Sequence, residues 1–319
     1  MSVQWINVRV REKRIAALDV AAFVLEAEDG GALPPFEAGA HVDLALPNGL
    51  VRQYSLCGAP GRSACYELGI LLEAEGRGGS RSAHADLHEG DRLRISAPRN
   101  LFALVPGQHA VLMAGGIGIT PILAMAEHLA AAGASFELHY FTRSQDRAAF
   151  VERLDGPAFA GRIHYHFDDR PETRLDIPAR LSAPAADTHL YVCGPGGFMD
   201  HVLDSARAAG WADANVHSER FTAAPADHAA DDPFEVEIAG TGTVVPVGTG
   251  QSVVAALAAA GISVPVSCEQ GICGTCVMQV VEGIPDHRDM YLSDEDHAAN
   301  DQFTPCCSRA LTPRLVIQL

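Results

Sequence analysis

The sequence lacks the long apolar run that a membrane-spanning helix requires. No stretch of about 18 apolar residues is uninterrupted among its 319 residues, so we expect no membrane span. The first residues include Arg9, Arg11 and Arg14 where a signal peptide would need an apolar segment. Low-complexity tracts and internal repeats are also missing. These absences favour an ordinary globular protein of two or three domains, with the cytoplasm as the expected compartment.

Basic side chains are scarce, above all near the C-terminus. The chain has 23 Lys and Arg against 40 Asp and Glu, a net charge of −17. Residues 223–319 contain 3 basic and 13 acidic residues and so carry −10 of that charge. This acidity argues against nucleic-acid binding. It either aids solubility or steers this region towards a basic protein partner, and the sequence leaves both readings open.

Cysteine is present in an informative pattern. Eight cysteines in a chain without an export signal point to metal binding and a reducing compartment. Cys268, Cys273 and Cys276 are spaced C-x4-C-x2-C, and Cys306 follows at a distance. This spacing is typical of a plant-type [2Fe–2S] cluster, whose ligands are all thiolates. A structural zinc site usually has two C-x2-C-like pairs and fits less well, as do disulfides.

The chain falls into three blocks with a linker. Residues 1–100 show short alternating apolar runs broken by Gly and Pro, which predicts an antiparallel β-barrel. Residues 101–221 alternate apolar strands with helical segments, which predicts a parallel α/β domain. Residues 222–232, rich in Ala and Asp, are interpreted as a linker. Residues 233–319 fit a small α+β ferredoxin-like (β-grasp) domain.

Several elements can be placed from apolar runs and cap residues. In the middle block we expect a helix over Pro121–Ala132, with Thr120 as its N-cap and Gly133 as its stop. The expected strands there are His109–Ala114, Phe136–Thr142 and His189–Cys193. In the last block we expect strands Phe234–Ile238 and Thr243–Val247 and a helix Ser252–Ala260 that ends at Gly261.

Two motifs in the first block have the chemistry of flavin binding. In Arg52-Gln-Tyr54-Ser55, an Arg can pair with phosphate, a Tyr ring can stack on a flavin and a Ser can hydrogen-bond its edge. Taken alone, the motif is equally a strand with an outward Arg. Residues 76–80, Gly-Arg-Gly-Gly-Ser, precede a predicted helix that runs to Leu87, and a glycine-rich helix N-terminus can bind a phosphate. A plain flexible turn is the alternative.

Two motifs in the middle block place glycines at strand ends, where open α/β sheets bind ligands. Residues 114–121, Ala-Gly-Gly-Ile-Gly-Ile-Thr-Pro, join a strand to a helix, although they do not form a strict GxGxxG. Cys193-Gly194-Pro195 follows a later strand. Cys193 could be a small buried filler, but its position at the strand tip also suits a ligand contact.

The motifs taken together carry a resemblance that none carries alone. Arg-x-Tyr-Ser, Gly-Gly-x-Gly-x-Thr-Pro and Cys-Gly-Pro, in this order, resemble the ferredoxin–NADP reductase superfamily. The Gly-Arg-Gly-Gly-Ser loop and the C-terminal C-x4-C-x2-C block are similar to the phthalate dioxygenase reductase family, in particular its vanillate demethylase reductase branch. The run 286–289 (Asp-His-Arg-Asp) and the closing Cys306-Cys307-Ser-Arg-Ala extend the resemblance over all three blocks.

This resemblance implies FMN in the barrel, NADH in the middle domain, a [2Fe–2S] cluster in the last domain, and a Rieske-type oxygenase as the partner. The implied FMN residues are Arg52, Tyr54, Ser55, Gly69, Ile70, Leu71, Gly78, Gly79, Ser80, Thr120 and Phe221. The implied nucleotide residues are Gly116, Gly118, Thr120, Cys193, Gly194 and Pro195. Ser55, Thr120 and Cys193 would position flavin and nicotinamide, and the cluster ligands would be the four spaced cysteines.

The implied activity is electron transfer from a two-electron donor to a one-electron acceptor. NADH gives up two electrons as a hydride, a [2Fe–2S] cluster takes one at a time, and a flavin converts between the two. The resemblance favours Cys306 over Cys307 as the fourth ligand. It favours NADH, although Arg143 could pair with the 2′-phosphate of NADPH. A di-iron or haem oxygenase as acceptor, and a non-enzymatic redox sensor, are the other functions considered.

Overall fold

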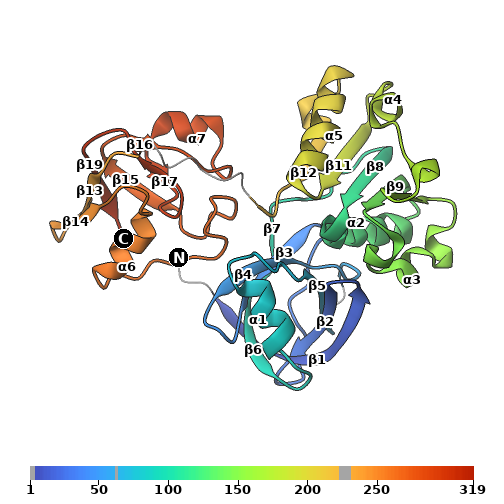
Figure 1. Cartoon of the computed structure of the whole chain (residues 1–319), viewed down its shortest axis with the longest axis horizontal. Helices are drawn as coiled ribbons and strands as arrows, with labels where there is room; N and C mark the ends of the chain where they lie inside the picture. The colour runs from blue at the N-terminus through green and yellow to red at the C-terminus, as the bar shows by residue number, and fades with distance from the viewer. Residues whose placement is uncertain (1–3, 62–63, 223–230) are drawn as a thin grey trace. The chain divides into compact units, whose positions relative to one another are not determined.

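The computed structural model describes residues 4–61, 64–222 and 231–319 and divides the chain into two compact units. The first unit is Met1–Arg220 and the second is Phe221–Leu319. Among the described residues, the first unit contains a seven-stranded and a five-stranded sheet, and the second contains a five-stranded and a two-stranded sheet with two helices (Figure 1). Most of the expected linker at 222–232 lies outside the described residues, and the predicted boundaries between the four segments stay predictions.

The first unit begins with an antiparallel barrel, which confirms that prediction. Its strands follow the order β4-β3-β6-β1-β2-β5, with β7 beside β3, and a bridge between Leu56 and Leu68 joins the two ends. Apolar residues that alternate along the strands, such as Val8 and Val10, fill a common core. The elements are β1 (Trp5–Ala17), β2 (Val20–Ala27), β3 (Ala40–Ala45), β4 (Val51–Ser55), β5 (Tyr66–Leu71), α1 (Gly79–Asp86), β6 (Arg92–Ser96) and β7 (Arg99–Asn100).

A parallel five-stranded sheet with order β10-β9-β8-β11-β12 follows, which confirms the α/β prediction. Its central strands β8 and β11 are buried almost throughout, as strands covered on both faces must be. All three predicted strands are confirmed. The elements are β8 (His109–Gly115), α2 (Ile119–Ala131), β9 (Ser135–Thr142), α3 (Val151–Leu154), β10 (Ile163–Phe167), α4 (Ile177–Leu181), β11 (Thr188–Cys193), α5 (Gly196–Ala208) and β12 (Val216–Glu219).

The predicted start of helix α2 is wrong. Thr120 is not the N-cap: Gly118 is, and the Thr120 hydroxyl instead donates to the Ile117 carbonyl at 3.0 Å. A 3-10 turn over Gly116–Gly118 leads directly into the helix, so the helix begins before the Thr-Pro pair that suggested a cap. Gly133, at φ 65°, follows the helix as the predicted stop.

The second unit is the α+β domain predicted for the C-terminus. Its main sheet has the order β14-β13-β19-β15-β17, in which β13 and β19 are parallel and the other pairs antiparallel. Ser252 caps the predicted helix by accepting a hydrogen bond from the Ala255 amide at 3.2 Å. The elements are β13 (Phe234–Ile238), β14 (Thr243–Val247), α6 (Val253–Ala259), β15 (Met278–Glu282), β16 (Pro285–Asp286), α7 (Asp294–Ala299), β17 (Gln302–Phe303), β18 (Arg309–Ala310) and β19 (Arg314–Gln318).

The described helices can be compared with the length and hydropathy that a membrane-spanning helix needs. Among residues 4–61, 64–222 and 231–319, no helix combines the length and apolar character needed to cross a bilayer.

Candidate active site and metal centre

The three closely spaced cysteines lie in the irregular loop between α6 and β15. Cys268, Cys273 and Cys276 are buried, with exposed fractions of 6%, 4% and 4%. Backbone amides point at the sulfurs: Gln270 N lies 3.4 Å from Cys268 Sγ, and Thr275 N lies 3.5 Å from Cys273 Sγ. Amides around sulfur stabilise thiolates and tune the metal that they bind. The loop therefore has the form of a preorganised thiolate site.

The fourth cysteine, Cys306, reaches the same group from the segment between β17 and β18. Its thiol is within hydrogen-bonding reach of Cys268 and Cys276. In the cluster-free protein, contact with the Cys268 thiol and burial raise the pKa of the Cys273 thiol far above its usual value. Four crowded, mostly buried thiols cannot all ionise without a compensating cation. These residues fit a polynuclear iron centre, which supplies that charge.

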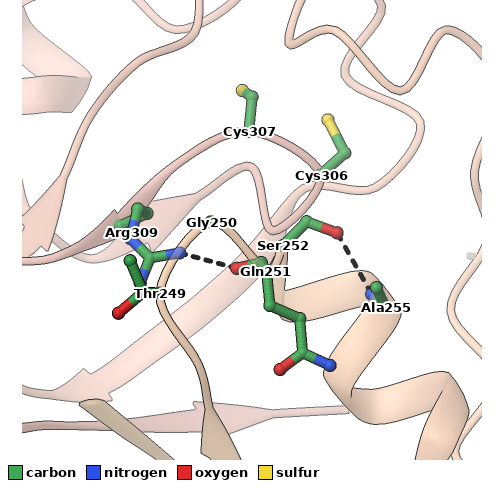
Figure 2. A pocket seen from close by; sticks show the side chains of 8 residues that line it. All are labelled: Thr249, Gly250, Gln251, Ser252, Ala255, Cys306, Cys307 and Arg309. Atoms are coloured by element: carbon green, nitrogen blue, oxygen red, sulfur yellow. Dashed lines mark hydrogen bonds between the residues drawn. The ribbon is translucent and has the colours of Figure 1, made fainter. Parts of the chain in front are cut away.

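The neighbouring Cys307 is within hydrogen-bonding reach of Cys306, and its sulfur also contacts two hydroxyl groups. Its sulfur lies 3.3 Å from Thr304 Oγ1 and 3.9 Å from Ser308 Oγ. Figure 2 shows Cys306 and Cys307 at the rim of a cavity of about 500 Å³, which is lined by Thr249, Gly250, Gln251, Ser252, Ala255, Cys306, Cys307 and Arg309. The contacts of Cys306 with two cysteines of the loop, Cys268 and Cys276, support its prediction as the ligand.

In the first unit, the two predicted phosphate-binding motifs are adjacent. Gly78, at φ 88°, caps α1, and a Cβ added at Gly79 would lie 2.6 Å from the Arg52 side chain of β4. The Arg52 side chain therefore runs past the N-terminal turn of α1. The Ser80 hydroxyl accepts a hydrogen bond from the Glu73 amide at 3.0 Å, which closes the loop before the helix. A guanidinium beside a helix N-terminus is suited to bind a phosphate.

The predicted nucleotide motifs also meet, at the carboxyl ends of β8 and β11. A Cβ at Gly118 would lie 2.2 Å from the Cys193 carbonyl oxygen, so only glycine allows this approach. A Cβ at Gly194 would lie 2.9 Å from Gly115 Cα. Pro195 caps the following helix, α5. Two loops that bear backbone amides are thus packed together where an open α/β sheet binds its ligand.

One acidic residue at this site was not predicted. Glu219, the last residue of β12, accepts a hydrogen bond from the buried Ser55 hydroxyl at 3.4 Å. Protein atoms enclose its carboxyl group, and this burial raises the pKa of Glu219 to about 8, although the Ser55 hydrogen bond lowers it. Burial, with a smaller effect of Glu219, raises the pKa of the Cys193 thiol, which stays protonated.

Comparisons with known proteins agree with this geometry. Residues 236–311 match the family model of a 2Fe-2S iron-sulfur cluster binding domain. The chain is 56% identical over 305 residues to a vanillate O-demethylase oxidoreductase from Pseudomonas putida, covering 95% of this chain and 96% of that protein. Its fold matches phthalate dioxygenase reductase, described as a modular structure for electron transfer from pyridine nucleotides to [2Fe–2S], with a TM-score of 0.78, 36% identity and coverage of 99% and 98%.

The chain belongs to the phthalate dioxygenase reductase family. This membership confirms the predicted class, an oxidoreductase that uses FMN, NAD(H) and a [2Fe–2S] cluster and serves as the reductase component of an oxygenase system. A type IV self-sufficient cytochrome P450 monooxygenase has the same fold in part of its chain, with a TM-score of 0.85, 36% identity and coverage of 99% of this chain and 41% of that one.

The remaining predicted flavin residues of this family member differ in how deeply their side chains are buried. Tyr54 on β4 is half-buried, and burial raises its pKa to about 12, so its hydroxyl stays neutral. Ile70 is 1% exposed within the barrel core, so only its backbone can reach a flavin. Leu71 is half-buried at the end of β5. Phe221 begins the second unit, and its predicted place over the flavin stays a prediction.

The sequence carries only a weak signal for Glu219. It lies in Ser-Glu-Arg-Phe, directly before Phe221 and the Ala- and Asp-rich segment. Neither periodicity nor cap residues mark β12, which has only four residues. The pairing of Ser55 with Glu219 joins positions 164 residues apart, which local patterns do not reveal.

Proposed function

We propose that this chain is the NADH-dependent reductase of a Rieske-type aromatic oxygenase, with O-demethylation of a methoxylated aromatic acid as the partner's reaction. The similarity of nearly the whole chain to the vanillate O-demethylase oxidoreductase carries this proposal. The adjoining flavin and nucleotide motifs and the crowded cysteines support it. The Rieske centre and the aromatic substrate would belong to the partner.

We assign the residue roles from the family resemblance, and the contacts described above support them. Arg52, Gly78, Gly79 and Ser80 would hold the FMN phosphate at α1, with Tyr54, Ser55 and the strand Gly69–Leu71 along the flavin ring. Gly116, Gly118, Cys193, Gly194 and Pro195 would bind the pyridine nucleotide, with Thr120 between the two cofactors. Cys268, Cys273, Cys276 and Cys306 would hold the cluster.

The protein's own contribution to the reaction is geometry and proton control. When bound, FMN accepts a hydride from NADH and supplies single electrons to the cluster. No side chain has to act as a general acid or base in hydride transfer, because the hydride moves with its electrons. Ser55 and Glu219 are hydrogen-bonded beside the predicted flavin strand. Burial raises the pKa of Glu219 to about 8 in the FMN-free protein, and we propose that this carboxyl group holds or releases a proton when the flavin changes charge.

The acidic second unit is proposed as the docking surface for the oxygenase. The exposed Asp294 and Glu295 lie in the first turn of α7, and the unit has few basic residues. A basic surface on the partner would be attracted, and this attraction would weaken as salt screens it. Electron transfer to cytochrome c, a basic haem protein, should therefore slow as ionic strength rises, while NADH oxidation with a neutral acceptor should not.

An anaerobic titration of the purified protein with NADH tests the proposal. We expect FMN to be released on denaturation, and absorbance near 450 nm and the broad iron–sulfur bands to bleach together. A cluster that stays oxidised while the flavin bleaches would contradict the electron path. Reconstitution with a Rieske oxygenase should support demethylation of a methoxybenzoate. A haem acceptor is the second candidate, because a P450 monooxygenase shares this fold, and exclusive reduction of a P450 domain would favour it.

A further inference from the structure

Phe150 has an unusual backbone conformation for its type. Its φ of 61° and ψ of 22° lie in the left-handed region, which bulky side chains rarely adopt. The residue is only 4% exposed and directly precedes the short helix α3. Local strain of this kind persists only where the surrounding structure determines it, and it clusters at functional sites. The contacts that hold Phe150 in this conformation therefore indicate its role.

Two arginines hold the aromatic ring. The guanidinium groups of Arg14 and Arg153 lie 5.8 Å and 5.6 Å from the ring centroid, within cation–π range. Both arginines form ion pairs with Glu67 of β5, and Arg153 also donates to the Cys57 carbonyl at 2.8 Å. Arg14 and Glu67 belong to the barrel, whereas Phe150 and Arg153 belong to the segment that follows β9. The ring is thus fixed to the barrel.

The edge of the ring reaches the predicted cofactor residues. A Cβ added at Gly69 on β5 would lie 3.0 Å from Phe150 Cζ and 2.8 Å from the Thr120 methyl group. Gly69 is therefore enclosed by Phe150 and by Thr120 of α2, the helix that follows the first nucleotide-binding loop. The three residues meet where the flavin strand of the barrel contacts the nucleotide-binding sheet.

We propose that Phe150 is a positioning residue that sets how closely the nucleotide-binding sheet approaches the flavin strand, and thereby the hydride-transfer distance. The inference rests on the proposed roles of Gly69 and Thr120. A smaller or more flexible side chain would leave a gap between β5 and α2 and let the two sheets shift. Misplacement by about 1 Å can slow a reaction about 100-fold while binding is retained.

The test compares Phe150→Leu and Phe150→Met with wild type in the fully loaded protein. Anaerobic stopped-flow measures flavin bleaching at rising concentrations of NADH and of NADH deuterated at C4, which gives the limiting hydride-transfer rate and the Kd separately. We expect the limiting rate to fall about 10- to 100-fold, with Kd, FMN content and cluster spectrum within about twofold of wild type. Phe159→Leu is the matched control, since Phe159 is also buried (5% exposed) but packs edge-on against Phe136 of β9, whereas the Phe150 ring packs against Gly69.

A double-mutant cycle between Gly69 and Phe150 measures whether the two positions are coupled in their effect on hydride transfer. A general loss of stability would not produce this coupling. Gly69→Ala introduces a methyl group against the Phe150 ring, so its cost in hydride-transfer rate should be smaller in the Phe150→Leu background. Wild-type rates in both Phe150 variants, or an equal loss in Phe159→Leu, would overturn the inference. So would a change confined to Kd. If wild type is not bleached by NADH at all, the proposed function fails, and this inference fails with it.

Discussion

Replacement of Glu219 by glutamine should change how the stability of the first unit depends on pH. In the folded, FMN-free protein the pKa of Glu219 is raised from 4.5 to about 8 by burial. Below pH 4.5 the carboxyl group is protonated in both the folded and the unfolded state. As pH rises towards 8, the unfolded chain loses this proton first, so the free energy of unfolding of wild type falls with pH. The amide side chain of the Glu219→Gln variant does not titrate, so this part of the pH dependence would vanish.

The magnitude follows from the size of the shift. At about 1.4 kcal/mol per pKa unit, and allowing for partial exposure of the residue, wild type should lose about 2–4 kcal/mol relative to Glu219→Gln between pH 5 and pH 8. The chain has 2 tryptophans, Trp5 and Trp211, and both lie in the first unit. Urea unfolding of the FMN-free protein followed by tryptophan fluorescence therefore reports on this unit alone.

The control is Glu172→Gln, which removes a carboxylate from the exposed surface and should leave the pH profile parallel to that of wild type. If Glu219→Gln also gave a parallel profile, Glu219 would not be held neutral by burial. The reasoning from the Ser55–Glu219 contact to proton control would then be wrong.

Three further substitutions test the proposed sites. Cys306→Ala should abolish the iron–sulfur absorbance, whereas Cys307→Ala should retain it, because Cys306 contacts Cys268 and Cys276 of the loop; visible spectra of anaerobically purified protein decide. Gly118→Ala should lower the free energy of unfolding by about 1–3 kcal/mol and weaken NADH binding, because its methyl group would collide with the Cys193 carbonyl; urea titration and stopped-flow kinetics measure this. Arg52→Ala should weaken FMN binding about 10- to 100-fold through loss of a charged hydrogen bond, as measured by fluorescence of released FMN.

Local sequence patterns were enough to predict many of the secondary-structure elements of this protein. The strand Phe234–Ile238 and the helix expected over Ser252–Ala260 depend on neighbours in sequence, and the structure has both, with the helix at Val253–Ala259. The start of α2 was wrong because a 3-10 turn, which has no distinctive pattern, extends the helix backwards through Ile119. The pair Thr120-Pro121 has the sequence of a helix start but lies inside α2.

The parts that were missed depend on long-range contacts. Glu219 acquires its raised pKa only when β12 brings it to Ser55, and Phe150 acquires its role only when the segment after β9 meets β5. Neither residue lies within one of the flavin, nucleotide or cysteine motifs of the sequence. Burial and strain arise from the whole fold, and single-sequence patterns do not contain them.

The fourth thiol, that of Cys306, comes from a separate segment of the chain, and this affects how the protein resists degradation in a cell. Cys276 and Cys306 are 30 positions apart, with β15, β16, α7 and β17 between them. An iron–sulfur centre held by both is a cross-link that closes this loop and restricts the unfolded chain much as a disulfide would. Its insertion also releases protons from crowded thiols. The supply of iron and sulfide would thus govern how long the second unit resists unfolding and proteolysis, as well as whether it conducts electrons.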